Sequence, residues 1–206
     1  MTTTDETQAG GAGTARSAGR PRSAKAEKAI IDATLDMIGE GMGLFELSIE
    51  AIAARAGVGK TTIYRRWCNK EDLFVDAVAT LKSPFPPPTG GSVRDDLIAC
   101  MRVFQRDAND ARSRCVMSIA MNEAERHPRL VERVSQAAIE PRKAVVTALL
   151  RRGMATGELR PDLDVALAMS SLVGTVMWYT RSQGEAASAP DLAERVVDHL
   201  LAGIGT

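Results

Sequence analysis

A short basic segment, residues 55–70, holds the side chains of this chain that are best suited to binding a charged partner. No acidic residue lies within it, although the whole chain has 26 basic and 26 acidic residues. Its cations are Arg55, Lys60, Arg65, Arg66 and Lys70. Lysine and arginine beside phosphates release counterions, while threonine and arginine can read base edges. The segment therefore predicts contact with DNA; the alternative is a solvated amphipathic helix that happens to be basic.

Two short helices around a glycine-containing turn would position these side chains. Ser48 is a suitable N-cap for the first helix, in which apolar residues recur at i, i+3, i+4 and i+7 from Ile49. Gly57 follows and can adopt the positive φ that ends a helix. In the second helix, expected over 60–67, Ile63 and Trp67 face inward. A helix-turn-helix uses this arrangement to place its second helix in the major groove.

Residues 53–73 follow the pattern AxxAGVxKxTIYRxWxNKExL. In this pattern the chain resembles the DNA-binding region of the tetracycline-repressor (TetR) family of bacterial regulators, from near Arg22 to near Thr80. The resemblance implies a three-helix DNA-binding domain joined to an all-helical ligand-binding and dimerisation domain. The chain departs from the family pattern at Gly59, where serine or threonine is frequent, and at Cys68, where proline is frequent.

The resemblance also implies roles for individual residues. Base or groove contacts fall to Lys60, Thr61, Thr62 and Arg65. Phosphate contacts fall to Tyr64 and Lys70, and Trp67 becomes a packing residue. With the outward and flanking positions included, the candidate DNA-binding residues are Arg22, Ser48, Lys60, Thr61, Thr62, Tyr64, Arg65, Arg66 and Lys70.

The composition favours an all-α fold, because 45% of the residues are hydrophobic but only 4% are aromatic, and no strand pattern occurs. We expect about nine helices. They are expected near 23–39, 49–56, 60–67, from 69 onward, at 93–108, 110–127, 129–156 with a kink at Pro141, 164–183 and 191–204.

The chain divides at the Pro- and Gly-rich stretch 83–91. Residues 1–19 are expected to form a disordered arm, 20–82 a helix-turn-helix domain with a linking helix, and 83–206 a helical ligand-binding and dimerisation domain. A basic arm beside a helix-turn-helix can reach phosphates or the minor groove; the alternative is a tail that only keeps the chain soluble.

The last two helices are apolar nearly all round, which requires burial on both sides, either inside the domain or against another chain. We expect a homodimer that joins these helices in a four-helix bundle and reads a palindromic operator in double-stranded DNA. The candidate interface residues are Leu172, Val176, Leu192, Val196, Leu200 and Ile204.

Soft, adaptable side chains gather where a small-molecule pocket could form. The candidate ligand-binding residues are Met101, Phe104, Met117, Met121, Met169, Val173, Met177 and Trp178. The alternative is that they only fill a helical core. Because few polar residues accompany them, the expected effector is an apolar or amphipathic compound that releases a repressor from its operator.

Other classes find little support. His127 and His199 belong to no catalytic, metal-binding or phosphate-binding motif, so we expect no enzyme, no metal and no cofactor. No apolar run reaches membrane-spanning length, and the first residues hold no apolar core of the kind a signal peptide has. With three cysteines and no CxxC motif, we expect a cytoplasmic, nucleoid-associated protein. The remaining alternatives are a redox-sensing regulator acting through Cys68, an activator, and a nonspecific DNA-binding protein.

Overall fold

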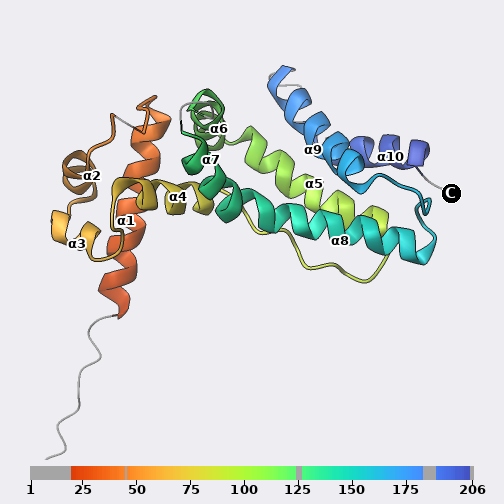
Figure 1. Ribbon diagram of the computed structural model, residues 1–206, viewed down its shortest axis with the longest axis horizontal. Coiled ribbons are helices and arrows are strands. Elements are labelled where there is room, and N and C mark those ends of the chain that lie inside the picture. Colours follow the sequence, from red (N-terminus) through yellow and green to blue (C-terminus); the bar gives the residue numbers. More distant parts are fainter. Residues whose placement is uncertain (1–19, 45, 124–126, 183–188, 205–206) are drawn as a thin grey trace, which may run out of the picture.

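The computed structural model describes residues 20–44, 46–123, 127–182 and 189–204, which form helices and connecting loops without a strand (Figure 1). The arm at 1–19, expected to be disordered, lies outside these described residues. The helices are α1 (Arg20–Gly39), α2 (Ile49–Ala56), α3 (Lys60–Tyr64), α4 (Lys70–Thr80), α5 (Val93–Asn109), α6 (Ala111–Glu123), α7 (Pro128–Val134), η1 (Ser135–Ile139), α8 (Glu140–Thr156), α9 (Val165–Ser182) and α10 (Leu192–Ile204). The all-α prediction is confirmed.

The molecule is elongated, with α1–α3 at one end, α9 and α10 at the other, and α6 and α7 between them (Figure 1). Two hydrophobic cores support the two ends. The first joins α1–α4 and is centred on Ile30, Ile38, Ile52, Ile63 and Leu73. Val116 of α6 and Val134 of α7 also belong to it, so helices that follow the linker are packed against the helix-turn-helix end.

The second core joins α5, α8, α9 and α10, and its most deeply buried members include Leu97, Met101, Leu150, Leu172 and Val197. These residues come from helices that are far apart in the sequence, and apolar rows at i and i+4 bring them together. Among the described residues, no helix is both long enough and apolar enough to cross a membrane.

The helix expected over 129–156 is interrupted, as the proline inside it predicted. The interruption is a π-helical turn, η1, which ends just before Glu140; the Glu140 N–H donates to the carbonyl of Ser135. Pro141 has no N–H and its ring would clash with the carbonyl four residues earlier, so a widened turn relieves the clash. If α7, η1 and α8 are counted as one interrupted helix, the described residues hold the nine helices expected.

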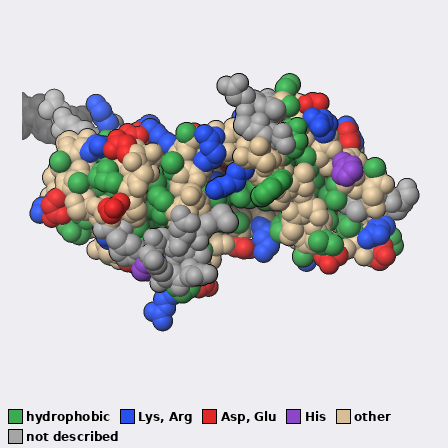
Figure 2. Space-filling model, turned by 90° about the horizontal axis from the view of Figure 1, so that it is seen from above, with side chains coloured by type: hydrophobic (Ala, Val, Ile, Leu, Met, Phe, Trp, Pro, Cys, Tyr) green, Lys and Arg blue, Asp and Glu red, His purple; other side chains and the backbone are tan. Residues whose placement is uncertain are grey.

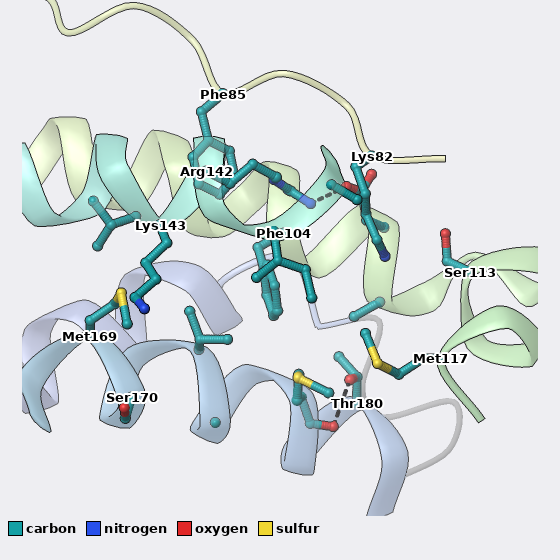
Figure 3. A pocket seen from close by; sticks show the side chains of 18 of the residues that line it. Lys82, Phe85, Phe104, Ser113, Met117, Arg142, Lys143, Met169, Ser170 and Thr180 are labelled. Atoms are coloured by element: carbon teal, nitrogen blue, oxygen red, sulfur yellow. Dashed lines mark hydrogen bonds and ion pairs between the residues drawn. The ribbon is translucent and has the colours of Figure 1, made fainter. Parts of the chain in front are cut away.

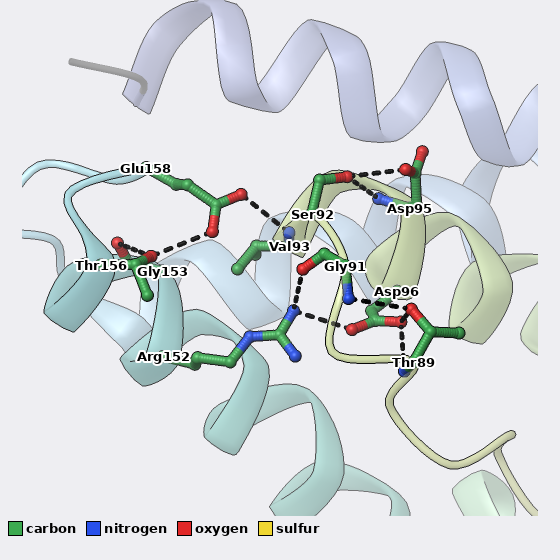
Figure 4. A network of polar contacts seen from close by, with 10 residues as sticks. All are labelled: Thr89, Gly91, Ser92, Val93, Asp95, Asp96, Arg152, Gly153, Thr156 and Glu158. Atoms are coloured by element: carbon green, nitrogen blue, oxygen red, sulfur yellow. Dashed lines mark hydrogen bonds and ion pairs between the residues drawn. The ribbon is translucent and has the colours of Figure 1, made fainter.

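The linker 83–91 is extended and is fixed to the second core by a buried carboxylate (Figure 4). Asp96 of α5 accepts from the Thr89 N–H at 2.9 Å and from the Thr89 hydroxyl at 2.8 Å, and it pairs with Arg152 of α8 at 2.7 Å. Burial alone would raise the pKa of Asp96, but the Thr89 and Arg152 hydrogen bonds outweigh it and lower that pKa. The linker is therefore a structured connection between the two ends.

Candidate DNA interface and ligand cavity

The helix-turn-helix is built by local signals in α2 and α3. Ser48 caps α2, and its hydroxyl accepts from the Ala51 N–H at 3.1 Å. Gly57 ends α2 with φ at +65°, a backbone conformation that costs glycine little. Gly59 starts α3 without a side-chain cap, where the family pattern often has a hydroxyl. Ser48 thus has a structural role, and its proposed DNA contact stays a prediction.

The regular part of α3 is shorter than expected, ending at Tyr64, although the Trp67 N–H still donates to the Ile63 carbonyl at 3.0 Å. Ile63 and Trp67 are buried, as expected, and the Trp67 indole N–H donates to Asp76 of α4 at 2.8 Å. Four candidate DNA-binding residues are exposed on or directly after α3: Lys60, Thr61, Tyr64 and Arg65; Thr62 is half-buried.

Several cations of the basic segment are paired within the chain. Arg55 pairs with Glu40 at 2.6 Å and Lys60 with Glu50 at 2.9 Å. The Glu50 hydrogen bond raises the pKa of Lys60. Both pairs are solvent-exposed, and such pairs contribute little, so a phosphate can replace the carboxylate. The Arg65 side chain has no hydrogen bond or ion pair with any residue in the described ranges.

Arg66 was expected to face outward, and the structure corrects this. Its side chain is only 16% exposed and lies against α1. The guanidinium donates to the Ser23 carbonyl at 2.7 Å, to the Ser23 hydroxyl, and to Glu27 at 3.3 Å. Arg66 therefore fixes the end of α3 to α1. Periodicity within α3 could not show this, because the partners come from a helix about 40 residues earlier.

Two further candidates lie at the edges of the interface. Lys70 donates from its ammonium to the Leu47 carbonyl at 3.3 Å, which holds it beside the start of α2. Arg22 lies in the first turn of α1, and its side chain is outside the described residues. Their DNA contacts stay predictions.

A cavity of about 400 Å³ lies between α5, α6, α8 and α9, near the middle of the molecule (Figure 3). In the space-filling view, lysine and arginine side chains border a hollow in this central region (Figure 2). Five of the residues predicted to bind ligand line the cavity: Phe104, Met117, Met169, Val173 and Met177. These five side chains border a cavity, and their role in ligand binding stays a prediction.

Two residues predicted to bind ligand do not line the cavity, and the prediction for a third is untested. Met101 is fully buried in the second core and does not line the cavity, because α5 turns it toward α8–α10. Trp178 is 74% exposed and does not line the cavity. The side chain of Met121 lies outside the described residues.

The sequence reasoning missed the charged part of the cavity, which includes Lys82, Asp107 and Arg142. Arg142 pairs with Asp107 at 2.8 Å, and both side chains are nearly buried. A signal for this was present: Arg142 lies between Ala138 and Val146 in an i, i+4 row of apolar residues. A cation in such a row is rarely buried without a partner or a ligand.

Four of the six residues expected at the dimer interface are corrected by the structure. Leu172, Val176 and Leu192 are fully buried inside one protomer, and Val196 nearly so, because α9 and α10 pack on α5. Leu200 packs partly buried against the same core, and the side chain of Ile204 is outside the described residues. The exposed apolar residues of α9 lie on its other face: Leu167, which is 65% exposed, and Trp178.

The fold and the two sites together define a DNA-binding regulator of the helix-turn-helix class. Comparison with known proteins agrees. Residues 30–77 match the model of bacterial regulatory proteins of the tetR family, and residues 86–200 match a tetracyclin repressor-like C-terminal domain. The chain belongs to the tetR family of transcriptional regulators, as its motif indicated, and it is a regulator, not an enzyme.

Individual relatives extend over most of the chain. The HTH-type transcriptional regulator YdeS of Bacillus subtilis is 29% identical over 161 residues, covering 78% of this chain and 80% of YdeS. The structure is similar to the fatty acid degradation regulator FadR from Bacillus halodurans, with a TM-score of 0.67 and 23% identity over 86% of this chain and 95% of that one. FadR from Bacillus subtilis, solved in complex with stearoyl-CoA, gives a TM-score of 0.64 at 22% identity over 86% and 98%.

Proposed function

We propose that this chain is a homodimeric repressor that binds a palindromic operator through α3 and is released by a small molecule bound in the central cavity. The observation that carries the proposal is the exposed row Lys60, Thr61, Tyr64 and Arg65 on a helix held firmly by α1, α2 and α4. Threonine and arginine on such a helix can read bases, and lysine and tyrosine can bind phosphates. In this account residues 20–82 bind DNA and 83–206 bind ligand and dimerise.

Dimerisation is proposed through the outer face of α9. Leu167, Thr175 and Trp178 are exposed along this face, and Gly174 lies at its border with the cavity. Small residues let two helices approach closely, and large exposed apolar residues favour burial. One short helix reads few bases, so two copies related by a twofold axis would read an inverted repeat.

Contacts between the cavity and the DNA-binding end support release by a ligand. On α6, Ser113 and Met117 line the cavity, while Arg112 pairs with Asp36 of α1. In η1, Ala138 lines the cavity and belongs to the first core. A ligand that shifts α6 or η1 would therefore shift α1, and with it the spacing of the two α3 helices. Such coupling is reciprocal, so operator DNA should weaken ligand binding by the same factor.

A protein of similar fold supports the proposal that a small molecule binds this chain: FadR from Bacillus subtilis was solved in complex with stearoyl-CoA. A protein that acts on operators works beside the genome, so we place it in the cytoplasm with the nucleoid.

In-vitro selection from random double-stranded DNA tests the proposal. We expect enrichment of an inverted repeat whose half-site centres are separated by about 10 base pairs or a multiple of that spacing. The same selection with Thr61→Ala is the matched control, because it removes a reading hydroxyl without changing charge. Enrichment of no sequence, with a steep loss of binding in salt, would contradict the proposal and indicate a nonspecific DNA-binding protein.

A further inference from the structure

The ionisable residues around the cavity are mostly of one sign. Five cationic residues line it, against the single carboxylate of Asp107. They are Lys82, Arg114, Arg142, Lys143 and Arg181. Lys82, Phe85 and Arg142 lie on one side of the cavity, across from Met169, Ser170 and Thr180 of α9 (Figure 3). Lys82 and Arg142 therefore share one side of the cavity, while Met169 and Met177 of α9 lie on the other.

Arg142 is held in place with one edge of its guanidinium free. Nη1 pairs with Asp107 at 2.8 Å, and the guanidinium carbon lies 4.2 Å from the centre of the Phe85 ring. Nε and Nη2 are buried and have no hydrogen-bond partner. These two nitrogens share one edge of the planar group, and their parallel N–H bonds match the two oxygens of a carboxylate or phosphate.

Asp107 does not compete for that free edge. Its two oxygens already accept from Ser83, from the hydroxyl at 3.1 Å and from the N–H at 3.3 Å. Ser83 thus holds Asp107, and Asp107 in turn holds Nη1 of Arg142. The edge of the guanidinium formed by Nε and Nη2 has no partner. Buried donors without partners are costly, which suggests that a ligand acceptor satisfies them.

Two more polar groups on the cavity wall lack partners. The Ser113 hydroxyl is buried and has no hydrogen-bond partner. The Lys82 ammonium makes no hydrogen bond or ion pair with any residue in the part of the chain that the structure describes, and this side chain points into the cavity (Figure 3). Burial lowers the pKa of Lys82, and a bound anion would offset that cost.

From these contacts we infer that the effector is an amphiphile with an oxyanion head group, which binds Arg142, Lys82 and Ser113 while its apolar part lies along Phe104, Met117 and Met177. This inference names the ligand class for the cavity of the proposed function and rests on it. A carboxylate and a phosphate monoester share the required geometry, since each has two oxygens that can accept from two parallel N–H bonds at once.

Calorimetric titration of the full chain, without DNA, with dodecanoate, dodecyl phosphate, dodecanol and dodecylamine tests the inference. We expect an anionic probe to bind about tenfold or more tightly than dodecanol, because charge-assisted hydrogen bonds replace unpaired donors. The preference between dodecanoate and dodecyl phosphate then identifies the head group. Equal binding of dodecanol and both anions, tightest binding of dodecylamine, or no binding of any probe would overturn the inference.

Variants locate the anion. Arg142→Lys keeps the charge beside Asp107 but loses the two-nitrogen edge, and Lys82→Met removes the other cation; each should reduce the preference for the anion about tenfold. Lys28→Met is the matched control: it removes the same charge from an exposed residue of α1 that does not line the cavity and that pairs with Asp32 at 2.6 Å, and it should keep the preference. If the preference survives in both Arg142→Lys and Lys82→Met, the assignment is wrong. Since no DNA is present, failure here is separate from failure of operator binding.

Discussion

Replacing Arg65 or Arg66 with methionine removes the same charge from neighbouring positions, yet the structure predicts opposite effects. Arg66 is 16% exposed and bonds to Ser23 and Glu27 of α1. The Ser23 carbonyl bond is charge-assisted, whereas Glu27 is half-exposed and its contribution is screened, so Arg66→Met should cost about 2–3 kcal/mol. For a chain of this length that corresponds to a fall in Tm of about 4–12 °C.

Arg65 is exposed and makes no such contact, so Arg65→Met should change stability by less than about 0.5 kcal/mol. As a reading or groove residue it should instead lose about 1–3 kcal/mol of operator binding, or about fivefold to 150-fold in Kd. Thermal unfolding by circular dichroism and fluorescence anisotropy at several salt concentrations measure both quantities.

The salt dependence separates the two roles further. A residue that binds phosphate contributes about one to the slope of log Kd against log salt concentration. Arg66→Met should leave this slope unchanged at a temperature where the variant is folded. An unchanged Tm for Arg66→Met together with a smaller slope would refute the assignment of Arg66 to α1 and restore it as a DNA contact.

Three further outcomes follow from other parts of the molecule. Asp96→Asn should lower Tm, and because the pKa of Asp96 is depressed in the folded chain, the deficit should be full above its ordinary pKa of 3.8 and shrink as the pH falls below it. Burial raises the pKa of Cys100 to about 11, so Cys100 should react with a thiol reagent at pH 8 only after unfolding, whereas the exposed Cys68 should react at once. If mild peroxide abolishes DNA binding in the unmodified sequence but not in Cys68→Ser, the redox alternative is supported. Leu167→Asp with Trp178→Asp should yield monomers in analytical ultracentrifugation with little change in Tm, since both side chains are exposed in the protomer, and an intact dimer would rule out this face of α9.

The helix-turn-helix was predictable because its signals are local. The Ser48 cap, the left-handed Gly57 and the inward pair Ile63 and Trp67 all lie within 20 residues, and each is where the pattern placed it. Pro141 predicted where the long helix is interrupted. It did not predict that the interruption is a π-helical turn, because that depends on how the backbone relieves the proline clash.

The remaining errors share a physical cause, which is contact between distant segments. Arg66, just after α3, is amphipathic and could point either way until α1 is docked against it. On a helix as apolar as α9, periodicity cannot decide which side meets its own protomer, so Leu172 was assigned to the dimer and Trp178 to the ligand. The Arg142–Asp107 pair joins α8 to α5 across 35 positions; the apolar row around Arg142 indicates a buried cation, but nothing in either helix alone identifies its partner.

The central claim is that this chain reads a DNA sequence. The most direct test is fluorescence anisotropy of the purified protein at physiological salt on the inverted repeat enriched by selection, against scrambled DNA of the same composition. The account predicts a preference of about 10³-fold or more for the repeat, and loss of most of it in Arg65→Met. Equal affinity for both DNAs would contradict it, since the exposed row on α3 would then bind phosphates without reading bases.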